Sequence, residues 1–149
     1  MDVQQREANI VGGERPSDFE SFLFRRQAEL ILDLIKPHAG ERVLIIGCGR
    51  NDYLPLFKEK WCSVTALDSS AEPLKAIRQG LPADVVRGEA EDLPFSDDEF
   101  DIVMMINFLE TSRNSHQVIR EAIRVCRGRI FIGFLNGFSL AGTRQKLKQ

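Results

Sequence analysis

The chain has 149 residues, of which 43% are hydrophobic and 28% charged, as expected for one globular domain with a substantial core. Lys and Arg number 20 against 22 for Asp and Glu, so the net charge of -2 gives no reason to expect a nucleic acid or a membrane as partner. No apolar run approaches the length of a membrane span, and the start MDVQQREAN is not typical of a secretory signal. We expect a single cytoplasmic domain over residues 1–149.

The predicted elements alternate along the chain. A polar arm, residues 1–16, precedes a helix over 17–36, where Ser17 and Glu20 form a capping box. After it come five apolar strands and the helices between them. In chain order we expect a strand over 42–46, a helix over 52–59, a strand over 63–68, a helix from 69 or 70 to 79, a weak strand over 83–88, a strand over 100–106, a helix over 115–126, a strand over 129–135 and a helical tail over 136–149.

Apolar positions predict which faces of the two longest helices are buried. Phe24, Ala28, Ile31 and Ile35 recur at helical spacing in the first helix. In the helix over 115–126, the predicted buried face consists of Ile119, Ala122, Ile123 and Cys126.

The cysteines and histidines do not form the pattern of a metal site or of a disulfide framework. Cys48, Cys62 and Cys126 have no C-x-x-C spacing, and each has apolar neighbours. With His38 and His116 as the two histidines, a zinc centre has too few ligands. We therefore expect buried free thiols in a reducing compartment and no bound metal.

Strands that are apolar throughout and separated by helices are typical of a parallel sheet covered on both faces. Right-handed crossovers then produce a doubly wound, Rossmann-like three-layer α/β sandwich with strand order 3-2-1-4-5. Its cofactor-binding core is expected over residues 42–135. Ligands of such folds bind at the carboxyl ends of the strands, beside the first strand.

A Gly-Cys-Gly corner in VLIIGCGRNDY, residues 43–53, falls at that point. A dinucleotide needs G-x-G-x-x-G, but Asp52 occupies the third glycine position and would repel the pyrophosphate. S-adenosylmethionine has no phosphate and carries a cationic sulfonium, so Asp52 opposes it far less. Asp68, at the end of the second strand, can accept hydrogen bonds from both ribose hydroxyls; the alternative is an acid that caps the next helix.

A resemblance to one enzyme family runs from Arg42 to Ile132. It is carried by the stretches RVLIIGCGR, VTALDSS, GEAEDLPFSDDEFDIV and REAIRVCRGRIFI. These resemble the successive motifs of class I S-adenosylmethionine-dependent methyltransferases, in particular the type 11 family that contains the ubiquinone and menaquinone biosynthesis methyltransferases. AEDLPFSDDEFDIV is the most specific of them, because its order of acids, Leu-Pro-Phe turn and Phe-Asp strand entry is distinctive.

The resemblance implies how the cofactor is bound. The glycine corner would lie under its methionine part, and Asp68 would hold the ribose with Ser69 beside it. Glu89 would accept from the exocyclic amine of adenine, while the backbone N–H of Ala90 reaches a ring nitrogen; a solvated acidic loop is the alternative there. The implied cofactor-binding residues are Gly47, Cys48, Gly49, Asp68, Ser69, Glu89, Ala90 and Ile106.

The implied reaction is methyl transfer to a small-molecule acceptor, by direct displacement at the methyl carbon of the sulfonium. Asn107, Glu110 and His116 would lie on the acceptor side, but the sequence selects no catalytic base. Two positions depart from the family pattern, because Ile45 replaces an acid and Asn51 replaces a glycine. A non-catalytic methyltransferase-like binding or scaffold domain therefore stays open as the alternative.

The end of the chain also departs from that pattern. Domains of this family continue past the fifth strand into a helix and an antiparallel hairpin, whereas NGFSLAGTRQKLKQ offers one basic helix. The chain is thus either a fragment or naturally shortened. The fifth strand would then have an uncovered apolar edge, so we expect self-association, most simply as a two-fold dimer.

Overall fold

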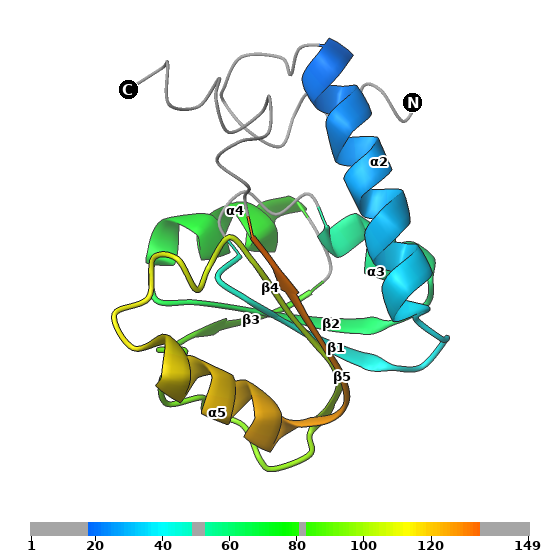
Figure 1. The fold of residues 1–149 in the computed structure, drawn as a ribbon. Coiled ribbons are helices and arrows are strands. Elements are labelled where there is room, and N and C mark those ends of the chain that lie inside the picture. Colours follow the sequence, from blue (N-terminus) through cyan, green and yellow to red (C-terminus); the bar gives the residue numbers. More distant parts are fainter. Residues whose placement is uncertain (1–17, 49–52, 81–82, 135–149) are drawn as a thin grey trace.

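A five-stranded sheet lies between two layers of helices in the computed structural model, which describes residues 18–48, 53–80 and 83–134 (Figure 1). In chain order the elements are α2 (Asp18–Ile35), β1 (Arg42–Ile46), α3 (Leu54–Glu59), β2 (Ser63–Asp68), α4 (Ala71–Gly80), β3 (Asp84–Arg87), β4 (Phe100–Ile106), α5 (Ser115–Val125) and β5 (Cys126–Gly133).

The sheet has the strand order β3-β2-β1-β4-β5, and all four neighbouring pairs are parallel. The central strand β1 pairs with both β2 and β4, so that Val43 lies beside Val64 on one side and Ile102 on the other. This confirms the predicted doubly wound fold and its strand order.

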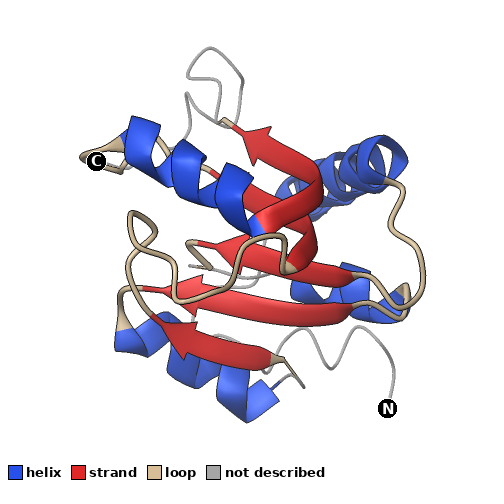
Figure 2. Ribbon diagram, turned by 90° about the horizontal axis from the view of Figure 1, so that it is seen from below, coloured by secondary structure: helices blue, strands red, loops and turns tan. Residues whose placement is uncertain are grey.

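Alternate residues of the central strand face two separate apolar clusters. Val43 and Ile45 pack under α2, α3 and α4, whereas Leu44 and Ile46 pack against α5 and the loop before β4. Figure 1 shows α4 and α5 on opposite sides of the sheet, and Figure 2 shows helices on both of its faces. The three-layer sandwich is thereby confirmed.

The predicted faces of the two longest helices fare differently. Ala28, Ile31 and Ile35 of α2 are buried, as predicted. For α5 the prediction holds for Ala122, which is buried, and for Ile119 and Cys126, which pack against the same cluster. It was wrong for Ile123, which is exposed, and the buried face also carries Glu121. That face contacts the sheet through Val118, Ala122 and Val125.

Predicted strand boundaries hold for β1, β2 and β4, but not for β5. That strand begins at Cys126 rather than Arg129, directly after α5, and Cys126 pairs with Phe100 across a register shift. A Cβ at Gly128 would overlap the carbonyl oxygen of Asp101, so a glycine is needed for β5 to approach β4 this closely. Phe134 lies beyond the end of the strand. The expected helical tail, like Ser17 of the capping box, lies outside the described residues.

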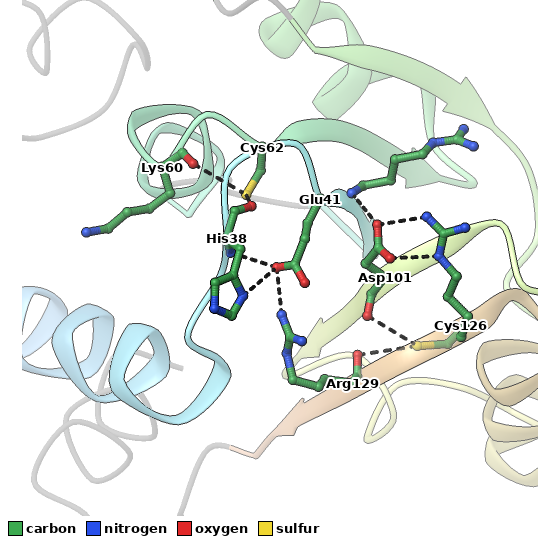
Figure 3. Close-up of polar contacts among 9 residues, drawn as sticks. His38, Glu41, Lys60, Cys62, Asp101, Cys126 and Arg129 are labelled. Carbon is green, nitrogen blue, oxygen red and sulfur yellow. Dashed lines mark hydrogen bonds and ion pairs between the residues drawn. The ribbon is translucent and has the colours of Figure 1, made fainter.

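Ion pairs join β1, β4 and β5 at the amino edge of the sheet (Figure 3). Glu41 Oε2 accepts from the backbone N–H of His38 and from Arg129 Nη2, both at 2.7 Å. Asp101 accepts from the backbone N–H of Arg42 at 2.9 Å and binds Arg127 through both carboxylate oxygens, at 2.7 and 3.1 Å. These contacts hold the end of the sheet that is remote from the carboxyl ends of the strands.

Candidate cofactor site at the carboxyl edge of the sheet

Backbone hydrogen bonds align the carboxyl ends of the strands. Gly47 N donates to Leu67 O at 2.9 Å, and Gly88 N donates to Asp68 O at 3.0 Å. The residues that follow β1 and β3 are therefore both bonded to the end of β2. The structure thus brings to one edge all the predicted site residues that it describes; Gly49 lies outside the described residues. Those at the edge are Gly47, Cys48, Asp68, Ser69, Glu89, Ala90 and Ile106.

Gly47 occupies a position that a larger residue could not share with Phe108. Its φ of 71° lies in the left-handed region, and a Cβ there would overlap the Phe108 ring. Phe108 belongs to the loop after β4 and was not singled out from the sequence. The group that approaches the backbone closely at Gly47 is therefore the Phe108 side chain of the protein itself.

The carboxylate of Asp68 contacts Ser70 and Cys48. Oδ1 accepts from the backbone N–H of Ser70 at 2.9 Å, and Oδ2 lies 3.6 Å from the Cys48 thiol. The contact with Ser70 is an Asx turn that precedes α4, because the Ser70 N–H lies before the helix, which begins at Ala71. Each carboxylate oxygen has two acceptor positions, so this turn and ribose binding are compatible. Ser69 is exposed beside Asp68.

The predicted adenine-binding pair lies in the loop that follows β3. Glu89 is exposed, whereas Ala90 is 3% exposed and packs in the apolar cluster with α5. Asp92 N donates to Glu89 O at 3.2 Å, which closes a short turn around the pair. An exposed acid beside a buried small residue is suited to a ligand that lies on the edge of the core.

Three residues of α5 bind this loop, and sequence reasoning missed all of them; the first, Gln117, donates through Nε2 to Glu91 O at 3.1 Å. Glu121 accepts from Leu93 N at 2.7 Å, and Arg124 donates to Phe95 O at 2.8 Å and Leu93 O at 3.0 Å. The hydrogen bond from Arg124 holds the pKa of Glu121 below its usual value, even though burial opposes this. One signal was available in the sequence, namely an acid three residues before an arginine, on the buried face of an amphipathic helix.

The residues expected on the acceptor side are mostly exposed. Ile106 is partly buried at the end of β4, and Asn107 is exposed with a φ of 53°. Glu110 and His116 are also exposed. Displacement at a sulfonium requires alignment rather than covalent help from the protein, so this edge is compatible with the chemistry without a selected base.

Ile45 is 4% exposed and packs in the apolar cluster under α2, α3 and α4. The acid expected at this position is thus replaced by a core residue. The second departure, Asn51, and the carboxylate of Asp52 lie outside the described residues.

Two further findings concern other classes of site. Within residues 18–48, 53–80 and 83–134, no three side chains of His, Cys, Asp or Glu are grouped to hold a metal ion. None of the helices in these ranges is both long and apolar enough to cross a bilayer.

Residues 44–132 match the family described as "Methyltransferase domain". A demethylmenaquinone methyltransferase from Thermotoga maritima is 33% identical over 113 residues, which are 72% of this chain and 48% of that protein. A malonyl-[acyl-carrier protein] O-methyltransferase from Pectobacterium atrosepticum is 38% identical over 81 residues, 54% of this chain and 32% of that protein. The chain therefore spans half or less of these two relatives.

The fold is also that of solved structures. A SAM-dependent methyltransferase from Aquifex aeolicus superimposes with a TM-score of 0.60 at 26% identity, covering 70% of this chain and 62% of that one.

Proposed function

This chain belongs to the methyltransferase domain family, and on that premise we propose that it binds S-adenosylmethionine and transfers its methyl group to a small-molecule acceptor. The observation that carries the proposal is the alignment of Gly47, Asp68 and the Glu89–Ala90 turn along one edge, in the order in which methionine, ribose and adenine follow one another in the cofactor. Parallel α/β sheets bind their ligands at this edge.

In the proposed complex the cofactor supplies the activated methyl group and the protein supplies alignment. Asp68 accepts from the ribose hydroxyls, Glu89 accepts from the adenine amine, and the Ala90 N–H reaches a ring nitrogen. The corner of Gly47, Cys48 and Gly49 supports the methionine part, and Ile106 borders the cofactor beside the acceptor. Holding donor and acceptor in line converts an encounter in solution into an oriented displacement.

A small organic acceptor is the class that we propose. One relative is named for demethylmenaquinone, the other for a malonyl group on a carrier protein, so relatives of this chain differ in acceptor. The net charge of -2 offers no attraction for a nucleic acid. Three free cysteines are consistent with a reducing compartment, and we propose the cytoplasm.

Substitution of the ribose acid tests the proposal. Asp68→Ala is expected to weaken the binding of S-adenosylhomocysteine at least severalfold, because it leaves ribose hydroxyls without an acceptor, at a cost of about 1–3 kcal/mol. Asp84→Ala is the matched control, since Asp84 is an exposed acid at the opposite end of the neighbouring strand. Calorimetric titration of both variants decides; equal affinities for Asp68→Ala and Asp84→Ala would refute the ribose contact.

We also propose that two copies of the chain associate through β5. Among the described strands β5 forms one edge of the sheet, and Ile130 and Phe134 are exposed at 37% and 63%. Ile130→Lys places a charge on this edge, which opposes strand pairing between copies. Light scattering at micromolar concentration should give a dimer mass for the native chain and a monomer mass for the variant. A monomer mass for the native chain would contradict the proposal.

A further inference from the structure

The loop between β3 and β4 depends on contacts from outside itself. Its internal backbone hydrogen bonds are the turn from Asp92 N to Glu89 O at 3.2 Å and a tight contact from Phe95 N to Leu93 O at 2.8 Å. At its start, Gly88 N is bound to Asp68 O. The remainder of the loop has to be positioned by another element if Glu89 and Ala90 are to meet a base in one place.

Helix α5 provides that positioning through Gln117, whose Nε2 donates to Glu91 O at 3.1 Å, and through two residues that lie further along the helix, one turn apart. Glu121 binds the N–H of Leu93, and Arg124 binds the carbonyls of Leu93 and Phe95. Arg124 also binds Asp97 Oδ1 at 2.9 Å, and its own carbonyl accepts from Asp98 N at 2.9 Å. Glu121 and Arg124 thus hold four loop residues, which are Leu93, Phe95, Asp97 and Asp98, in addition to Glu91 held by Gln117.

The two residues also fix each other. Arg124 Nε donates to Glu121 Oε1 at 2.8 Å, and Arg124 Nη2 donates to Glu121 Oε2 at 2.9 Å. Glu121 is 9% exposed and lies among the residues by which α5 packs on the sheet. The Arg124 guanidinium is planar and is bound to Glu121 and to the loop at the same time, so it has little freedom to turn. The position of the loop is therefore fixed relative to the core.

We propose that Glu121 and Arg124 are positioning residues for adenine recognition, which hold the loop so that Glu89 and Ala90 meet the base at the edge of the sheet. This inference rests on the proposed function. Neither residue is assigned contact with the cofactor; both act through residues 93–98 of the loop, by backbone contacts and by the side chain of Asp97. Loosening them should therefore reduce discrimination at the base more than it alters the methionine end.

The test compares two ligands that differ at the base. S-inosylhomocysteine carries a carbonyl where S-adenosylhomocysteine carries the exocyclic amine. The ratio of the dissociation constant of S-inosylhomocysteine to that of S-adenosylhomocysteine therefore measures adenine recognition. Arg124→Gln should lower this ratio by about three- to tenfold, the range that one hydrogen bond supports. Arg124→Lys keeps the charge but cannot bind both carbonyls and Glu121 at once, so it should lower the ratio by less.

Arg127→Gln is the matched control. Arg127 makes an equally bidentate contact with Asp101, but at the amino edge of the sheet, so its loss should leave the ratio unchanged. An unchanged ratio in a folded Arg124 variant, or an equal loss in Arg127→Gln, would overturn the inference while the proposed function stands. If Arg124→Gln does not fold, Arg124→Lys decides. A native chain that binds neither ligand would overturn the proposed function, and this inference with it.

Discussion

The Cys48 thiol lies 3.6 Å from Asp68 Oδ2, which joins the corner after β1 to the acid at the end of β2. We expect Cys48→Ala to weaken binding of S-adenosylhomocysteine by about twofold, because a thiol is a weak donor and Asp68 keeps its bond to Ser70. In an Asp68→Ala background the same substitution should have no further effect. Dissociation constants for the four proteins form the double-mutant cycle, and fully additive effects would contradict the link.

The overlap between a Cβ at Gly47 and the Phe108 ring predicts that substitution of this glycine lowers the free energy of unfolding more than substitution of Gly40 does. Gly40 also has a positive φ, of 85°, but nothing lies within 4 Å of its Cβ position, so Gly40→Ala reports the backbone cost alone, about 1–2 kcal/mol. Gly47→Ala should cost about 2 kcal/mol more in the free energy of unfolding, because the ring or the backbone has to move. Chemical denaturation measures both.

Removing the Phe108 ring separates the backbone cost of a side chain at Gly47 from the cost of the overlap with the ring. Phe108→Ala should recover part of the loss in a Gly47→Ala background, since the overlap is then absent. If Gly47→Ala costs no more than Gly40→Ala, the ring moves freely and the argument for a close approach fails.

Acid pH should destabilise the protein through its paired carboxylates. The hydrogen bond from Arg124 holds the pKa of Glu121 below its usual value, and Arg127 does the same for the pKa of Asp101. Such groups stabilise the fold fully above their unfolded pKa values of about 4, and this contribution is lost as the pH falls through the lower, folded values. The free energy of unfolding should therefore decline as the pH falls below about 4.5.

Glu121→Gln tests whether Glu121 contributes to this loss of stability at acid pH. The variant should be less stable than the native chain at pH 7 and should lose stability less steeply below about pH 4.5, because one proton-linked group is gone. Circular dichroism is the appropriate probe, since Trp61 is 82% exposed and its fluorescence would report unfolding poorly. An unchanged slope would show that the lowered pKa of Glu121 is not linked to folding.

Restoring the acid at position 45 should have opposite effects on affinity and stability. Ile45→Glu combined with Asn51→Gly is expected to tighten S-adenosylmethionine binding by giving the ammonium group a carboxylate. It should also lower the free energy of unfolding by about 2–4 kcal/mol, because the new side chain enters an apolar cluster. Ile45→Gln with Asn51→Gly is the uncharged control. Equal affinities for the two double variants would show that position 45 does not reach the ligand.

Local sequence patterns were sufficient to predict the limits of three strands. β1, β2 and β4 are mainly apolar, and their predicted limits agree with the structure. The start of β5 was missed because the segment from Cys126 to Gly128 has the composition of a turn. Its strand character depends on pairing with Phe100 and on the contact between Gly128 and Asp101, which arise only in the folded sheet.

The candidate site was predictable to the extent that topology determines it. Parallel strands in the order 3-2-1-4-5 bring their carboxyl ends together, and so they place Gly47, Asp68 and Glu89 along one edge. The supporting residues Phe108 and Arg124 could not be found in this way, because they act across contacts between distant segments. Arg124, for example, binds a carbonyl 31 positions away.

The central claim is that this edge binds S-adenosylmethionine, and calorimetric titration of the native chain tests it most directly. We predict saturable binding of both S-adenosylmethionine and S-adenosylhomocysteine at a single site, with no heat from NAD at the same concentrations. Neither heat nor a thermal shift at millimolar S-adenosylmethionine would contradict the claim, and would leave a methyltransferase-like domain without cofactor function.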